Sequence, residues 1–402
     1  MRNISALLLA ASWCAWTPAH AADVRTGLDV LVESRFAQLK GKRVGLITNQ
    51  TGRSRDGKSD VELLAKAPGM TLAAVFSPEH GFQGVLEEAQ VSSDALKLSD
   101  GRLIPLYSLY GATLAPTAAM LAGLDALVFD IQDVGARFYT YSATMGMAME
   151  AAGAANLEFY VLDRPNPING DTIEGPVLDP EIRHFIAYFP IPIRHGMTLG
   201  EIALAHIGLD QVKVRLHVIA MKGWGRKLWY DQTGLPWIKP SPNMPDLDSA
   251  TLYPGIACLE FTNLSVGRGT PHPFLWVGAP WLDASALLKR LEQAKLAGIS
   301  FQLQEYTPTK STHEGKLCRG IAMRITNREQ LRPLRVFAHL ICALRDLHPK
   351  QFELHWDQTK RMVGTEAFLR HYESAAAPER IIEMLDAGTR DFRMTRKPYL
   401  IY

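Results

Sequence analysis

The sequence is poor in cysteine, in long apolar runs and in blocks of basic charge. Only 4 of its 402 residues are cysteine, and they lack the spacing of a metal-binding cluster. The formal net charge is +2, and no basic stretch is interleaved with aromatic residues, which excludes the usual signature of a nucleic-acid surface. The chain therefore reads as a globular protein that binds small, weakly charged ligands and not nucleic acid.

Several catalytic signatures are missing as well. Without a Gly-x-Ser-x-Gly segment, acyl transfer by a serine triad is not indicated. The first apolar run ends in Asn49-Gln-Thr-Gly-Arg53, which is not a phosphate-cradling glycine pattern, so nucleotide binding is not indicated either. The His-x-His and His-Glu-x-x-His spacings of metalloenzymes are also lacking. We predict no metal and no other cofactor.

The first 22 residues have the features of a secretory signal peptide: a basic start, an apolar middle and an Ala-x-Ala ending. We predict cleavage after Ala21 or Ala22 and a periplasmic or extracellular protein that makes no membrane contact afterwards. A membrane anchor is the alternative, but the apolar stretch is interrupted well short of the roughly 20 residues that span a bilayer. Cys14 follows the bulky Trp13, which argues against lipid attachment.

Three cysteines would remain after cleavage: Cys258, Cys318 and Cys342. An odd number in an oxidising compartment permits at most one internal disulfide. Because at least Cys258 lies in an apolar run, we expect buried thiols.

Residues 43 to 221 alternate apolar, strand-like runs with amphipathic stretches. The runs cover residues 43–48, 71–76, 125–130, 158–163 and 214–219, and the helix candidates cover 59–67, 139–155 and 198–208. Continuous apolar strands separated by helices indicate a parallel sheet covered on both faces. We predict an α/β, Rossmann-like domain.

The texture changes after Lys222, where Trp, Pro, Gly and Asn become frequent up to about Pro280. Irregular stretches of this length are usually binding loops or lids. Helix patterns return at 283–297 and 335–347, around two strands near Phe301 and Ile321. We predict a signal peptide at 1–22, a catalytic domain at 23–280 and a smaller α+β domain at 281–402.

Each of the first four apolar runs ends in a polar cluster closed by glycine or proline. These clusters begin at Thr48, Ser77, Asp130 and Asp163. In an open parallel sheet, ligands bind outside the carboxyl ends of the strands, where such loops converge. Four clusters at equivalent ends predict one shared cleft, although each cluster alone is also ordinary turn chemistry.

Glu79, in the segment Phe76-Ser-Pro-Glu-His-Gly-Phe82, is the candidate general acid of this cleft. Pro78 and Gly81 stiffen the loop, and Phe76 and Phe82 flank Glu79, where rings packed over the carboxyl group would favour its protonated form. A protonated carboxyl group can donate to a leaving oxygen. The structural alternatives are a helix cap or an arginine pair, and a third hypothesis is a metal held by Glu79, His80, Asp130 and Asp133.

Six motifs together resemble one known family, the NamZ-type exo-β-N-acetylmuramidases, long catalogued as a domain of unknown function. They lie in order along the chain: Asn49-Gln-Thr-Gly52, Phe76 to Phe82, Asp130 to Tyr141, Leu162 to Pro167, Glu174-Gly-Pro176 and Arg194 to Thr198. The resemblance runs from about Gly27 to the C-terminus. It implies a glycoside hydrolase that removes β-1,4-linked N-acetylmuramic acid from the non-reducing end of peptidoglycan fragments, with its site on a Rossmann-like domain that a smaller domain closes.

The resemblance also implies that Glu79 is the catalytic acid. Most glycosidases use a second carboxylate, for which Asp130 is the first candidate and Asp133 and Glu260 are alternatives. The 2-acetamido group of the substrate can replace that carboxylate as nucleophile, so the stereochemistry stays open.

Muramic acid carries a lactyl carboxylate, which requires a cation or a helix N-terminus. Arg137, Arg164, Arg194 and Arg268 are candidates, and each can instead pair with a structural acid. Aromatic candidates for stacking on a sugar ring are Tyr139, Tyr141 and Trp224. The complete predicted substrate-binding set is Asn49, Gln50, His80, Gln132, Asp133, Arg137, Tyr139, Asp163, Arg164, Asn166, Arg194, Asn243, Glu260, Asn263 and Arg268.

The main rival hypothesis is a non-catalytic periplasmic protein that binds sugars or muropeptides, because an acidic residue in a cleft serves hydrogen bonding equally well. The sequence does not indicate an oligomeric state.

Overall fold

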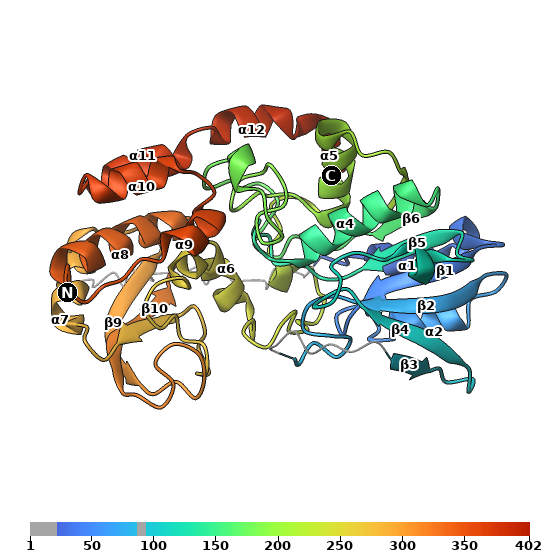
Figure 1. Cartoon of the computed structure of the whole chain (residues 1–402), viewed down its shortest axis with the longest axis horizontal. Coiled ribbons are helices and arrows are strands. Elements are labelled where there is room, and N and C mark those ends of the chain that lie inside the picture. Colours follow the sequence, from blue (N-terminus) through green and yellow to red (C-terminus); the bar gives the residue numbers. More distant parts are fainter. Residues whose placement is uncertain (1–21, 87–93) are drawn as a thin grey trace, which may run out of the picture.

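The structure, a computed structural model, describes residues 22–86 and 94–402. Apart from Ala22, the predicted signal peptide lies outside these residues. Figure 1 shows two lobes, with a seven-stranded sheet in one and a three-stranded sheet in the other. The predicted fold class, a Rossmann-like α/β domain with a second, smaller α+β domain, is confirmed.

The large sheet has the strand order β3-β4-β2-β1-β5-β6-β7 and is parallel except for the antiparallel pair β3-β4. Its strands are β1 (Arg43–Thr48), β2 (Thr71–Ser77), β3 (Asp94–Lys97), β4 (Leu103–Ser108), β5 (Ala126–Asp130), β6 (Glu158–Leu162) and β7 (Arg215–Ile219). The five predicted strands are confirmed. Prediction missed β3 and β4, because the edge strand β3 and its neighbour β4 are largely exposed or half-buried, and β4 carries Pro105 instead of a continuous apolar run.

Helices cover both faces of this sheet. α1 (Gly27–Glu33) and α2 (Asp60–Ala65) pack on one face, and α4 (Tyr141–Ala154) and α5 (Leu199–Asp210) pack on the other; the short α3 (Ala118–Leu121) precedes β5. A capping box at Thr198 and Glu201 fixes the start of α5. The three helices predicted for this domain are confirmed with small shifts at their ends. The strand order reverses at β1, which has β2 on one side and β5 on the other, and this is where open α/β sheets bind ligands.

The second domain contains an antiparallel sheet in the order β8-β10-β9, formed by β8 (Trp276–Ala279), β9 (Ile299–Tyr306) and β10 (Cys318–Ile325). Its helices are α7 (Ala284–Gln293), α8 (Pro333–Leu347), α9 (Trp356–Val363), α10 (Ala367–Glu373) and α11 (Pro378–Asp386). Both predicted helices and both predicted strands are present. α6 (Leu247–Ile256) lies between the lobes in Figure 1 and packs on α8. The exact domain boundaries predicted from the sequence stay predictions.

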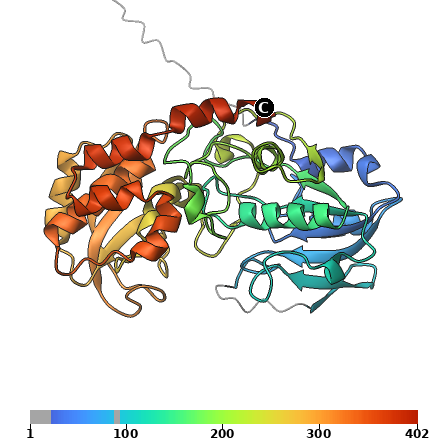
Figure 2. The ribbon, with the colours of Figure 1, turned by 45° about the horizontal axis from the view of Figure 1, so that its top comes forward.

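The chain finally returns to the first domain. α12 (Thr389–Thr395) crosses from the second lobe to the first, as Figure 2 shows. Arg396 then donates hydrogen bonds to the carbonyl oxygens of Gly170, His195 and Gly196. One apolar cluster continues from Ile47 in the first domain to Phe392 in α12, so the two domains share a core.

Cys258, Cys318 and Cys342 are free and buried, as expected from the sequence. Within residues 22–86 and 94–402, no helix combines the length and the apolar character needed to cross a bilayer.

Candidate active site

A cavity of about 280 Å³ lies where the first domain meets α6 and the second domain. The first domain contributes Glu79, His80, Tyr110, Phe138, Tyr139, Thr140 and Ile186. The loop before α6, α6 itself and the second-domain side contribute Ser241, Asn243, Met244, Tyr253, Glu260, Phe261, Arg268, Phe274 and Met362. Six predicted site residues therefore line one cavity: Glu79, His80, Tyr139, Asn243, Glu260 and Arg268.

Glu79 reaches the cavity because β2 ends in a tight turn. The Gly81 amide donates to the Pro78 carbonyl oxygen at 3.0 Å, and His80 and Gly81 both have positive φ angles, of 70° and 74°. A left-handed pair is costly unless glycine supplies one member, which explains the His-Gly sequence. Thr140 Oγ1 donates a hydrogen bond of 2.5 Å to Glu79 Oε2, which ties the turn to the start of α4.

His80 stabilises the same turn. Its Nδ1 atom lies 2.6 Å from the Leu86 carbonyl oxygen, and the Leu86 amide donates to the His80 carbonyl oxygen at 3.2 Å. His80 therefore fastens the loop that carries Glu79, in addition to lining the cavity.

Aromatic rings form one wall of the cavity, but they differ from those expected. Tyr253 packs edge-on against Phe138, Tyr139 and Phe274, with centroid distances of 5.3, 5.7 and 4.7 Å. Burial, reinforced by the Glu260 charge, raises the pKa of Tyr253 far above its ordinary value, so its hydroxyl group stays protonated at neutral pH.

The rings that flank Glu79 in sequence lie elsewhere. Phe76 is fully buried in the core, with its ring tilted against that of Tyr107, and Phe82 packs against the core on the opposite face of the sheet. Of the three rings expected to stack on a sugar, Tyr141 is buried and donates to the Pro240 carbonyl oxygen, and Trp224 packs against the ring of Tyr402. Tyr139 alone among the three lines the cavity.

Glu260 and Arg268 form an ion pair at the second-domain side of the cavity. Gly267 and Gly269, with φ angles of 80° and 77°, make the sharp turn that presents Arg268. The Arg268 guanidinium also lies 5.8 Å from the Phe274 ring centroid. Asn263, predicted from the same segment, instead bridges the Gln351 carbonyl oxygen and the Glu353 amide outside the cavity.

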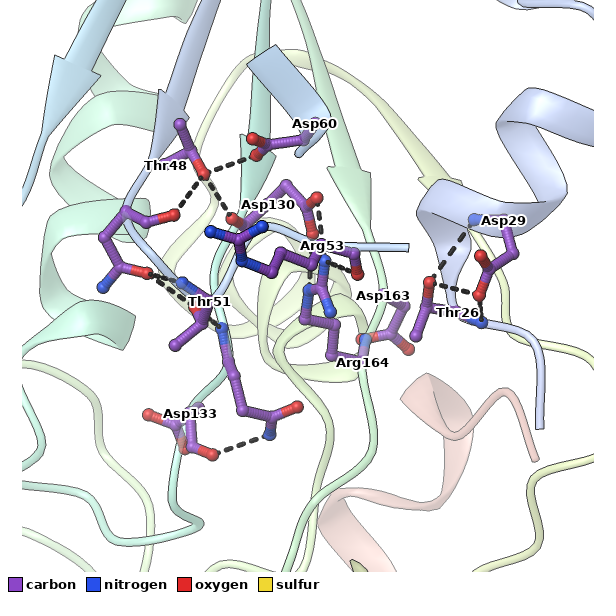
Figure 3. A network of polar contacts seen from close by, with 12 residues as sticks. Thr26, Asp29, Thr48, Thr51, Arg53, Asp60, Asp130, Asp133, Asp163 and Arg164 are labelled. Atoms are coloured by element: carbon purple, nitrogen blue, oxygen red, sulfur yellow. Dashed lines mark hydrogen bonds and ion pairs between the residues drawn. The ribbon is translucent and has the colours of Figure 1, made fainter. Parts of the chain in front are cut away.

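Asp130 and Arg164 lie in a buried polar network, shown in Figure 3, and do not line the cavity. Arg164 binds both carboxylate oxygens of Asp130, with distances of 2.5 and 2.9 Å. Thr48 Oγ1 lies 2.5 Å from Asp60 Oδ2 and 3.0 Å from the Asp130 carbonyl oxygen, which joins β1 to β5 and α2. Burial raises the pKa of Asp130 against the opposing effect of Arg164, and burial raises that of Asp60 further.

Asp163, at the end of β6, caps α5. It accepts hydrogen bonds from Thr198 Oγ1 at 2.7 Å, from the Gly200 amide at 2.9 Å and from the Tyr402 hydroxyl at 2.7 Å. Burial raises its pKa to about 6 even though these donors oppose the shift. Asp163 is part of the buried network drawn in Figure 3, and it does not line the cavity.

Arg137 and Arg194 are also buried away from the cavity lining. Arg137 donates to the carbonyl oxygens of Pro176, Ile191 and Met362, and so joins three segments. Arg194 pairs with Glu174 at 2.8 Å and donates to the Ile168 carbonyl oxygen. Of the four arginines considered for the lactyl carboxylate, only Arg268 lines the cavity.

The predicted amides likewise hold loops together. Asn49 Oδ1 accepts from the Thr51 amide at 2.9 Å, and Asn166 Nδ2 donates to the Met197 carbonyl oxygen. Gln50 Nε2 donates to the carbonyl oxygens of Lys239 and Pro240, and Gln132 Nε2 donates to those of Asp133 and Pro165. Asn49 and Gln50 border another pocket, of about 310 Å³, beside Phe82.

Asp133 accepts a hydrogen bond from the Gly135 amide at 2.7 Å, and its other oxygen, Oδ1, is buried without a partner among the described residues. Burial raises its pKa to about 7. His195 Nε2 lies 3.9 Å from Asp133 Oδ2. Burial lowers the pKa of His195 to about 3, so the imidazole is neutral.

The four residues of the metal hypothesis separate in space, because Glu79 and His80 line the cavity while Asp130 and Asp133 do not. Across the described ranges, no group of three or more His, Cys, Asp or Glu side chains is arranged to hold a metal ion.

Ten of the lining residues were not predicted as site residues, and two of these, Tyr110 and Thr140, lie beside Glu79. Thr140 lies inside the quoted segment Asp130 to Tyr141, where its hydroxyl group was overlooked beside larger polar side chains. Tyr110 follows β4, and the strand-end rule would have found it if β4 had been recognised.

Comparisons with known proteins agree over nearly the whole chain. Residues 44–248 match the N-terminal domain, and residues 251–402 the C-terminal domain, of the exo-β-N-acetylmuramidase NamZ family. The chain is 42% identical over 381 residues to the peptidoglycan β-N-acetylmuramidase NamZ of Bacillus subtilis, covering 94% of this chain and 91% of that protein.

Two crystal structures of DUF1343 family proteins from Bacteroides fragilis are also similar. One is 36% identical with a TM-score of 0.87 and the other 30% identical with a TM-score of 0.74, and each match covers 94% of this chain and 99% of the other. The family predicted from the six motifs is thereby confirmed: the chain belongs to the NamZ exo-β-N-acetylmuramidase family.

Proposed function

We propose that the cavity between the domains is the active site of an exo-acting glycoside hydrolase that releases N-acetylmuramic acid from the non-reducing end of peptidoglycan fragments. The observation that carries this proposal is the meeting of Glu79 with Glu260, Arg268 and an aromatic wall in one cavity. Membership in the NamZ family supports a hydrolase over the rival binding protein, because the curated relative is named for that activity. The substrates we propose are MurNAc-GlcNAc oligosaccharides and muropeptides.

Glu79 is the general acid in this proposal. Its carboxyl group is fixed by Thr140 at the cavity wall, where it can protonate the oxygen that leaves with the remaining sugar chain. The aromatic wall around Tyr253 supplies apolar faces on which a pyranose ring can stack.

Glu260 replaces Asp130 as our candidate for the second carboxylate. Asp130 is fully buried and bound through both oxygens by Arg164, so neither oxygen is available to substrate or water. Glu260 instead lines the cavity, where it pairs with Arg268, and its position there allows it to act as a base, a nucleophile or an orienting group.

Arg268 is our candidate for binding the lactyl carboxylate. A guanidinium group presents donors in a fork that matches a carboxylate, and Arg268 already meets one carboxylate, Glu260, at the cavity. The three other candidates, Arg137, Arg164 and Arg194, donate their hydrogen bonds to backbone carbonyl oxygens or buried acids.

The test of the activity is incubation of the purified protein with MurNAc-GlcNAc, GlcNAc-MurNAc and para-nitrophenyl β-MurNAc, with products identified by mass spectrometry. We expect free N-acetylmuramic acid from the first and third compounds and no cleavage of the second. If calorimetry shows that intact MurNAc-GlcNAc binds and is never cleaved, the binding-protein hypothesis replaces ours.

The role of Arg268 is tested with paired substrates. Arg268→Gln should raise KM for para-nitrophenyl β-MurNAc about 10- to 100-fold, the loss expected for a charge-assisted hydrogen bond. Hydrolysis of the matching β-GlcNAc compound, which lacks the lactyl group, should not fall with it. An equal loss on both compounds would reject the assignment.

We further propose that the protein acts after export, in the periplasm or outside the cell. The support is the basic, apolar and Ala-x-Ala pattern of residues 1–22. Fractionation of cells that produce the full chain should place a shortened protein outside the cytoplasm, and deletion of residues 2–20 should retain it inside. An unshortened protein in the membrane fraction would instead support an anchor.

A further inference from the structure

Two hydroxyl groups from separate parts of the first domain reach the carboxyl group of Glu79. Thr140 Oγ1, at the start of α4, donates to Glu79 Oε2 at 2.5 Å. Tyr110, which follows β4, lines the same cavity and lies close to Glu79. Burial and the Glu79 charge raise the pKa of Tyr110 to about 12, so its hydroxyl group keeps its proton at neutral pH.

The helix does not use the Thr140 side chain. Thr140 is the N-cap residue of α4, a position where threonine usually accepts a bond from the first turn, but here it makes no such cap. Its backbone carbonyl accepts instead from the Thr144 amide at 2.9 Å and from Thr144 Oγ1 at 3.2 Å. The Thr140 hydroxyl therefore gives up a capping bond worth about 1 kcal/mol and binds Glu79.

We propose that Thr140, assisted by Tyr110, is a positioning residue that sets which oxygen of Glu79 carries the catalytic proton. This proposal rests on the proposed role of Glu79 as general acid. A neutral carboxyl group has one carbonyl oxygen, which is its better acceptor, and one hydroxyl oxygen. Donation from Thr140 makes Oε2 the carbonyl oxygen and places the proton on Oε1.

The same contacts stabilise the product of proton transfer. When the glycosidic C–O bond breaks, its electron pair stays on the leaving oxygen, which takes the proton from Oε1. Glu79 is then a carboxylate, and water later supplies the hydroxyl group at the anomeric carbon and returns a proton. Thr140 and Tyr110 donate to the new charge, and the positive end of the 14-residue helix α4 lies directly behind Thr140.

The test uses four variants, each assayed on MurNAc-GlcNAc over a range of pH. Thr140→Val keeps the shape and removes the hydroxyl group, Thr140→Ser restores it, Tyr110→Phe removes the second donor, and Thr144→Val removes a hydroxyl group one turn further along α4. We expect Thr140→Val to lower kcat about 10- to 100-fold with little change in KM. Tyr110→Phe should lower kcat less, while Thr140→Ser and Thr144→Val stay near wild type.

The pH profile separates positioning from a structural role. A carboxylate that loses a donor holds its proton to higher pH, so the alkaline limb of kcat/KM should move upward in Thr140→Val, by about one pH unit, and not in Thr144→Val. A Thr140→Val enzyme with the kcat and profile of Thr144→Val would overturn the proposal. Failure of the proposed function looks different, because wild type itself would then release no N-acetylmuramic acid.

Discussion

The cavity and the buried polar network lie at the same end of the large sheet, and each contains carboxylates from the ends of parallel strands. The two regions differ in what covers these carboxylates. Glu79, after β2, lines the cavity between the domains. Asp130, the last residue of β5, is fully buried, and Asp163, directly after β6, caps α5. The covering groups come from far along the chain: Arg164 lies 34 residues from Asp130, and Tyr402 lies 239 residues from Asp163. Position at a strand end therefore marks the edge where ligands bind, but packing decides which carboxylate stays open to them.

The largest effect we expect from breaking this contrast is on catalysis, in Glu79→Gln. Loss of a general acid should lower the rate on MurNAc-GlcNAc by roughly 10²- to 10⁴-fold, while the melting temperature stays within a few degrees of wild type. Para-nitrophenyl β-MurNAc has a leaving group that needs less protonation, so the loss on it should be smaller. Unchanged turnover of the disaccharide would reject Glu79 as the acid and leave the enzyme class standing.

The opposite result is expected in the buried network. Arg164→Met leaves Asp130 buried without its partner, which should lower the free energy of unfolding by about 3–5 kcal/mol. Denaturant unfolding followed by circular dichroism measures the change. The double variant Arg164→Met/Asp130→Leu removes both charges and should recover much of the loss. If Arg164→Met folds with wild-type stability but is inactive, Arg164 belongs to the catalytic apparatus instead.

Local pattern was enough to predict the main strands and helices. Four of the five predicted strands are runs of mainly apolar residues between turn signals, and β7 alternates apolar with polar residues, which is also a strand pattern. β3 and β4 were not predicted because they are short or exposed, and their pairing depends on contacts with the rest of the sheet.

The site was predictable only in part. Six predicted residues line one cavity: Glu79, His80 and Tyr139 follow strands of the large sheet, and Asn243, Glu260 and Arg268 lie in turns of the irregular region after Lys222. Others, such as Arg137 and Asn166, have polar side chains that bind backbone carbonyl oxygens of distant segments. A polar side chain in a motif looks the same in sequence whether its partner is a ligand or a buried carbonyl, so this distinction needs the tertiary structure.

A smaller, pH-dependent effect is expected at Asp133, which is buried and does not line the cavity. Burial raises its pKa from 3.8 to about 7, so the folded state holds the proton more tightly than the unfolded chain. Its contribution to stability is then full below about pH 4 and is lost as the pH rises through 7. Relative to Asp133→Asn, wild type should lose on the order of 1 kcal/mol per pH unit across this window. Parallel stability curves for the two proteins between pH 5 and 8 would show that the pKa of Asp133 is not raised by folding.

The smallest effect we expect concerns Tyr402, the group that helps to close off Asp163. Its hydroxyl group donates to Asp163 Oδ2 and accepts from the Met221 amide at 2.8 Å, so Tyr402→Phe removes two hydrogen bonds and leaves buried partners unpaired. We expect the free energy of unfolding to fall by about 1–2 kcal/mol, because Thr198 and the Gly200 amide still donate to Asp163.

This loss should depend on pH. Burial raises the pKa of Asp163 to about 6, and the Tyr402 donor opposes that shift, so the loss should be greater at pH 8, where Asp163 is ionised, than at pH 5. Thermal unfolding at both pH values, with Tyr399→Phe as the control for losing a hydroxyl group from the same segment, measures the difference. A loss that does not depend on pH would mean that Tyr402 stabilises the fold by packing on Trp224 and not through the carboxylate of Asp163.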